Sequence, residues 1–199
     1  MARHPQYDRD TALSKAVSLF WEKGYHGSSM KQIEQALDMR PGSIYAAFGS
    51  KDGLYNEALA NYARLGGAEL TRHMAQYDSI IEGLQAYLRS IVRNGLSGSP
   101  SRACMIVKTL LETSNTHGDL ASQADELLNV IEQTLTGLLE RAQVQGELAA
   151  GVDCARLARL VQAQIMGLRA IAERKLSDTQ LASLADDMAD VLNHYRPTH

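Results

Sequence analysis

Two short segments, separated by the break 38–40, carry the side chains best suited to contact DNA. The first would begin at Ser29, a favourable helix N-cap, and the second at Pro41, whose missing N–H costs nothing in a first helical turn. Ile44 and Phe48 would form the buried edge of the second helix. In a helix-turn-helix, the second helix enters the major groove with its N-terminal residues against the bases. The candidate DNA contacts are Ser29, Lys31, Arg40, Pro41, Gly42, Ser43, Tyr45, Ala46 and Lys51.

The outer face of the second helix would offer small side chains and hydroxyl groups. Gly42 and Ala46 would let the backbone approach the DNA closely, and Ser43 would donate to a phosphate or a base edge. The Tyr45 hydroxyl and the Lys51 ammonium group would reach phosphates. Paired short helices also occur in all-α proteins that bind no DNA, so this pattern alone leaves a purely structural role open.

The charge distribution is compatible with a DNA-binding module without establishing one. The chain has 199 residues and a formal net charge of −3. Residues 1–51 carry +2 and residues 52–199 carry −5, so a mildly basic segment precedes an acidic body. A difference of this size is also common between the halves of ordinary proteins.

Several function classes lack the residues that they need. The two cysteines, Cys104 and Cys154, are too far apart in sequence for a CxxC metal or redox motif. The six histidines show no metal-ligand spacing, and no phosphate-binding glycine loop or GxSxG nucleophile motif occurs. No apolar run is long enough to span a membrane. We therefore expect no metal, no cofactor, no enzymatic activity and no membrane association, and a location in the cytoplasm.

Helical periodicity runs through almost the whole chain and predicts an all-α fold with about nine helices. Apolar residues recur at helical spacing within 13–21, 80–91, 127–142, 157–168 and 181–192. Short helices punctuated by glycines dominate the N-terminal quarter of the chain, and longer helices follow. This change predicts a helix-turn-helix domain at residues 1–52 and a larger helical domain at residues 53–199. A helix that begins at Lys51 would cross the boundary.

The N-terminal segment resembles the signature of TetR/AcrR-family transcriptional repressors. The resemblance rests on residues 20–33 (FWEKGYHGSSMKQI) and 41–54 (PGSIYAAFGSKDGL), which match the family's anchors in order and spacing. One position departs, because Ala47 stands where the family often has a histidine that contacts phosphate. The resemblance implies a dimeric repressor of a palindromic double-stranded DNA operator, released when a small-molecule effector or an oxidant acts on its C-terminal body. It also implies a homodimer interface formed by two helices at about 153–175 and 178–195.

Cys104 is a candidate sensing residue. It lies near a predicted helix N-terminus and close to Arg102, and both features favour a thiolate. The segment also resembles the reactive-cysteine subgroup of the family, typified by the N-ethylmaleimide reductase repressor. In that resemblance, Lys175 corresponds to the lysine thought to cross-link with the cysteine on oxidation. The competing interpretation is a small buried hydrophobic residue, which is what we expect for Cys154.

Larger side chains in the body either line an effector pocket or fill the core. The candidates are Tyr62, Tyr77, Tyr87, Met105 and Met166, and at helical spacing a core role is the more frequent one. The main alternative for the whole chain is a helical protein–protein adaptor with a non-functional helix-turn-helix. Salt-dependent binding to DNA would distinguish a regulator from such an adaptor.

Overall fold

The computed structural model describes residues 9–93 and 99–197. All regular structure in this part of the chain is helical, which confirms the predicted all-α fold of about nine helices. The helices are α1 (Arg9–Lys23), α2 (Met30–Leu37), α3 (Pro41–Phe48), α4 (Lys51–Met74), α5 (Ile80–Arg93), α6 (Met105–Thr113), α7 (Gly118–Val144), α8 (Cys154–Ile171) and α9 (Asp178–Asp190), followed by a 3-10 turn, η1 (Val191–Tyr195).

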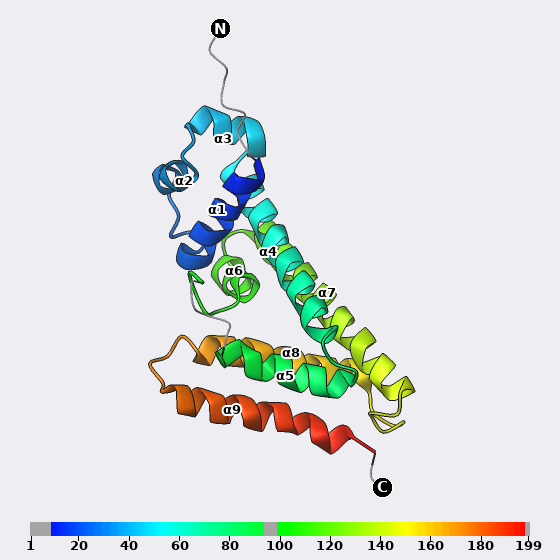
Figure 1. Ribbon diagram of the computed structural model, residues 1–199. Coiled ribbons are helices and arrows are strands. Elements are labelled where there is room, and N and C mark those ends of the chain that lie inside the picture. The colour runs from blue at the N-terminus through cyan, green and yellow to red at the C-terminus, as the bar shows by residue number, and fades with distance from the viewer. Residues whose placement is uncertain (1–8, 94–98, 198–199) are drawn as a thin grey trace.

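The three N-terminal helices form one end of the molecule (Figure 1). Helix α4 runs diagonally from this group toward a layer formed by α5, α8 and α9, and α7 runs alongside it. Helix α6 lies between the N-terminal helices and the layer. A change in the layer can therefore reach the N-terminal helices along α4 or through α6.

One hydrophobic core joins the N-terminal helices to the body. Ile33 of α2 and Ile44 of α3 belong to the same buried cluster as Tyr55 of α4 and Met105 of α6. The Tyr55 hydroxyl lies 2.7 Å from that of Thr109 within this core. The boundary between residues 52 and 53 stays a prediction, and packing is continuous across it.

A second core fills the space between α5, the C-terminal half of α7, α8 and α9. Ile81, Leu139, Val161 and Ala185 are buried there. Cys154 belongs to the same cluster with 7% of its surface exposed, which confirms its predicted packing role. Its Sγ lies 3.7 Å from a Gln143 side-chain oxygen, and burial raises the pKa of the thiol.

The two last helices are shorter than the sequence predicts. The predicted spans were about 153–175 and 178–195, whereas α8 ends at Ile171 and α9 at Asp190, where the 3-10 turn continues to Tyr195. Asp153 and Ser177 cap the N-termini, each accepting a backbone N–H. Within the described residues, no helix is long and apolar enough to cross a membrane.

Candidate nucleic-acid interface

Helix α2 begins and ends where the sequence predicts. Its N-cap is Ser29, whose Oγ accepts a hydrogen bond from the Gln32 backbone N–H at 3.3 Å. The Gln32 side chain accepts in return from the Ser29 N–H at 2.8 Å. Asp38 ends the helix in the left-handed conformation with φ of 55° and turns the chain toward α3. Ser29 therefore shapes the start of the helix, while Lys31 is exposed on its surface.

Helix α3 exposes the face that the sequence assigns to DNA. Arg40 is the N-cap residue, and its side chain makes no capping hydrogen bond. Ile44 is completely buried and Phe48 is 6% exposed, which confirms the predicted inward edge. Tyr45 projects outward with 48% of its surface exposed. The exposed residues of the helix are Pro41, Gly42, Ser43, Tyr45 and Ala46.

The start of α4 fixes the orientation of α3. Gly53 packs so tightly that a Cβ there would overlap the Phe48 carbonyl, so only glycine permits this approach. Gly49 ends α3 with a φ of 76°. The Arg9 guanidinium lies 5.0 Å from the Phe48 ring centroid and pairs with Glu57 of α4 at 2.7 Å. These contacts tie α1, α3 and α4 together behind the exposed face.

Lys51 makes a contact within the protein that the sequence does not predict. Its Nζ donates to the Tyr25 carbonyl at 2.7 Å and lies 4.1 Å from the Tyr25 ring centroid. Burial lowers the pKa of this amine. Next to it, the Tyr25 hydroxyl donates to Asp52, and burial together with this bond raises the pKa of Tyr25 to about 12. The predicted phosphate contact by Lys51 would have to compete with the Tyr25 carbonyl for the ammonium group.

Helix α6 supplies a contact to the turn between α1 and α2 that local sequence patterns do not reveal. The Glu112 carboxylate accepts the backbone N–H of Tyr25 at 3.0 Å and that of His26 at 2.7 Å. Gly24, predicted as the end of the first helix, has a φ of 74°, and a Cβ there would overlap Glu112. The sequence indicates the turn but not its partner, because the partner is more than 80 residues away.

The N-terminal end of α6 also contacts α1. Trp21 Nε1 donates to the Ala103 carbonyl at 2.7 Å, and Lys108 Nζ donates to the Trp21 carbonyl at 2.6 Å. On its other side, this segment meets the end of α8, where the Glu173 carboxylate accepts from the backbone N–H groups of Arg102 and Ala103. The start of α6 therefore connects α1 to α8.

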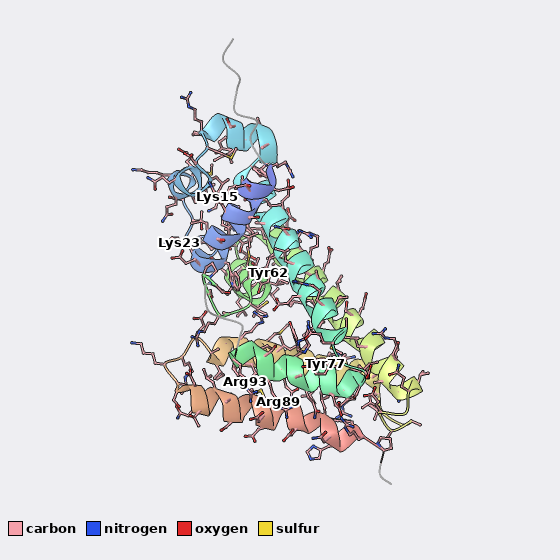
Figure 2. The ribbon with its side chains drawn as sticks, viewed as in Figure 1. Lys15, Lys23, Tyr62, Tyr77, Arg89 and Arg93 are labelled. Carbon is pink, nitrogen blue, oxygen red and sulfur yellow. The ribbon has the colours of Figure 1, made fainter. Side chains whose placement is uncertain are left out.

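Cys104 lies in this connecting segment. Cys104 is partly exposed, and its thiol lies near the hydroxyl of Tyr62. Tyr62 lies on the side of α4 that faces α6 (Figure 2). The Arg102 guanidinium donates to the Ala172 carbonyl at 3.0 Å. Lys175 is exposed in the connection between α8 and α9, and no hydrogen bond within the described residues joins it to Cys104. Redox sensing by this pair stays a prediction.

The remaining sensing candidates divide between the core and a cavity. Met105 is 1% exposed in the first core, Met166 is partly buried on α8, and Tyr77 is 37% exposed after α4. Tyr87, 8% exposed, lines a cavity of about 480 Å³. This cavity, which we call the Arg169 cavity, is lined by residues that include Trp21, Glu69, Arg72, Tyr87, Ile91 and Arg169.

Comparisons with known proteins cover both halves of the chain. The family described as "Bacterial regulatory proteins, tetR family" matches residues 12–58, and the "Tetracyclin repressor-like, C-terminal domain" matches residues 80–187. The chain is 27% identical over 180 residues to the HTH-type transcriptional repressor ComR of Escherichia coli (strain K12), covering 90% of this chain and 86% of ComR.

Solved structures resemble the chain over almost its full length. One is a cysteine mutant of the TetR family transcriptional regulator CifR in complex with a 26-base-pair double-stranded operator DNA. It has 29% identity and a TM-score of 0.82, and the match covers 98% of this chain and all of that one. The reduced form of Escherichia coli NemR has 17% identity and a TM-score of 0.79 over 96% of this chain and 97% of its own, a likeness of fold alone. Membership of the reactive-cysteine subgroup therefore stays a prediction.

The structure and the family matches point to the same kind of protein. Helix α2 is capped, α3 exposes a face of small residues, and both family models describe bacterial regulators. The second match alone spans more than half of the chain. This chain belongs to the TetR family of bacterial regulatory proteins and is a DNA-binding transcriptional regulator.

Proposed function

We propose that this chain is a homodimeric transcriptional repressor that acts in the cytoplasm and leaves a palindromic operator when an effector reaches its body. Residues 1–52 would form the DNA-binding domain, and residues 53–199 would sense the effector and dimerise. The observation that carries the proposal is the outer face of α3, where residues 41–43, Tyr45 and Ala46 are exposed around a buried Ile44. The proposal involves no catalytic step, and family membership favours it over the adaptor alternative.

DNA binding by α3 is tested with a mobility-shift assay on the fragment immediately upstream of the chain's own coding region. Tyr45→Ala removes the exposed hydroxyl that we propose contacts a phosphate, and it does so in both subunits. Affinity should fall about tenfold for each lost hydrogen bond to a charged group, and therefore about a hundredfold for the dimer. Tyr77→Ala is the matched control, because Tyr77 is also an exposed tyrosine but lies at the far end of α4. Equal binding by Tyr45→Ala and wild type would refute this docking of α3.

The proposed dimer uses α8 and α9. The outer side of α8 carries Leu160, 36% exposed, and the exposed Ala163, and Gly167 follows one turn later. Small and apolar residues at this spacing let a second helix approach closely. Leu160→Glu should shift the protein from dimer to monomer in sedimentation velocity, whereas Val144→Glu, at an 89% exposed apolar position at the end of α7, should not. A Leu160→Glu dimer as tight as wild type would exclude this interface.

Coupling between body and operator is proposed to run through α6. The residue Ala103, just before α6, is held by Glu173, which follows α8, and by the indole of Trp21 on α1. The C-terminal turn of α6 binds the backbone N–H groups after α1 through Glu112. Trp21 also lines the Arg169 cavity. An occupant that moves Trp21 or α6 would tilt α1 and α3 relative to the partner's helices. An effector shifts this equilibrium only by its differential affinity for the two states.

A further inference from the structure

The Arg169 cavity has a polar interior and a charged mouth. Glu69 and Arg72 are exposed residues of α4, whereas Tyr87 and Ile91 of α5 are buried. The cavity volume of about 480 Å³ lies within the range of small-molecule sites in proteins. A purely apolar molecule would leave these polar groups without partners, which is costly. The cavity therefore favours an occupant with a polar or charged group at one end.

Among the polar groups that line the cavity, Arg169 is a charged group without a carboxylate partner within the described residues. Arg169 is partly buried, and its guanidinium lies near the hydroxyl groups of Tyr87 and Tyr62 and near the thiol of Cys104. Burial raises the pKa of both tyrosines, so their hydroxyls are neutral at neutral pH and supply no negative charge. Within the described residues, the ion pairs of the structure involve other arginines and lysines. An inward guanidinium without a carboxylate partner is a favourable site for an anion.

The charges of the cavity select among anions. Arg169 and Arg72 contribute two positive charges and Glu69 one negative charge, so the lining has a formal net charge of +1 when His73, which also lines the cavity, is counted as neutral. A monoanion balances this charge, whereas a dianion such as a phosphate monoester would also meet the Glu69 carboxylate. The planar guanidinium matches the geometry of a carboxylate through two parallel hydrogen bonds. Trp21 and Ile91 offer apolar surface for the rest of the molecule.

We propose that the effector is a small organic carboxylate, whose carboxylate pairs with Arg169 and whose apolar part packs against Trp21 and Ile91. This inference rests on the proposed function, since it names the class of molecule that would release the operator. Pairing with the anion would change the surroundings of Trp21, whose carbonyl and indole N–H both bind the α6 segment. The occupant would thereby act on the contact that joins the body to α1.

Trp21 is the only tryptophan of the chain, so its fluorescence reports directly on this cavity. The full-length protein without DNA is titrated with cyclohexanecarboxylate, cyclohexanecarboxamide and cyclohexylmethylamine, which share a shape, differ in charge and do not absorb where tryptophan does. The carboxylate should change the emission saturably, with a Kd at least tenfold below that of the amide. The amine should bind more weakly than either.

Variants of arginine residues then show which side chain causes the preference for the carboxylate over the amide. Arg169→Gln should bring the Kd ratio of amide to carboxylate close to one, whereas Arg169→Lys should keep a reduced preference for the carboxylate. Arg159→Gln is the matched control, because Arg159 lies on the same helix but pairs with Glu132 outside the cavity. Cys104→Ala should retain the full preference, since the proposal assigns anion binding to Arg169 rather than to the thiol.

Several results would overturn the proposal. These are the absence of a saturable response to the carboxylate, equal or tighter binding of the amide or the amine, and an unchanged preference in a folded Arg169→Gln protein. Circular dichroism and sedimentation velocity establish that each variant is folded and has the wild-type oligomeric state. A mobility-shift assay without any probe is run in parallel. Loss of DNA binding there would count against the proposed function, whereas the fluorescence result concerns the ligand class alone.

Discussion

Replacing Glu112 with glutamine should loosen the turn after α1 without unfolding the protein. The carboxylate accepts two backbone N–H groups, those of Tyr25 and His26, at 3.0 and 2.7 Å. A hydrogen bond to a charged group contributes about 1.5–3 kcal/mol when buried. Glu112 is partly exposed and glutamine keeps one oxygen acceptor, so we expect a combined loss of about 1–2 kcal/mol. For a chain of this size, that loss lowers Tm by roughly 2–8 °C.

Amide hydrogen exchange measures this loss at the atoms concerned. Because local opening requires breaking both hydrogen bonds, exchange at Tyr25 and His26 should accelerate about 5–30-fold in Glu112→Gln. Amides of the second core that exchange only through global unfolding, for example that of Leu139, should accelerate by no more than the factor that the fall in Tm implies. Glu126→Gln, at an exposed glutamate of α7, serves as the control. Unchanged exchange at both amides in a folded variant would refute the role assigned to Glu112 and the proposed route through α6.

Further predictions concern the caps and close contacts of the body. Burial raises the pKa of Glu147, but its hydrogen bonds to the start of α5 outweigh this effect and hold the pKa below its ordinary value. The resulting stabilisation is present above the unfolded pKa of about 4.3 and is lost as the pH falls through the folded value. Urea unfolding at pH 7 should show Glu147→Gln destabilised by about 0.5–2 kcal/mol, with the difference from wild type vanishing toward pH 3. Gly53→Ala should lower both Tm and operator affinity, because the new Cβ would overlap the Phe48 carbonyl and displace α3; an unchanged melting curve would contradict the packing described. Tyr55→Phe should cost about 1 kcal/mol in chemical unfolding, since it removes the buried hydrogen bond to Thr109, and a neutral result would show that Thr109 is satisfied without it.

Local signals in the sequence are enough to predict helices α2 and α3. Ser29 is an N-cap, Pro41 opens α3, and Ile44 lies on the buried edge, because capping and helical periodicity depend on residues a few positions apart. The lengths of the last two helices, which the family resemblance implied, are overestimated. The apolar residues at helical spacing end at 168 and 192, close to the observed ends of α8 at Ile171 and of α9 at Asp190.

Capping residues and helical periodicity do not predict contacts between segments that are distant in the sequence. Lys51 carries a charge that suits phosphate, yet its amine binds the Tyr25 carbonyl, a partner that only the folded arrangement of α1 and α4 provides. Glu112 and Arg169 occupy unremarkable positions in amphipathic helices. Their roles arise because the fold places one beside a turn of the N-terminal helices and the other inside a cavity.

Dimethyl sulfate footprinting on the upstream fragment tests the central claim most directly, because it reports access to guanine N7 in the major groove. If two copies of α3 lie in the groove, wild-type protein should protect two symmetric half-sites on one face of the duplex. The protection should disappear at the same concentration of Tyr45→Ala and persist with Tyr77→Ala. A single protected site, or protection that is identical for Tyr45→Ala and wild type, would contradict the account.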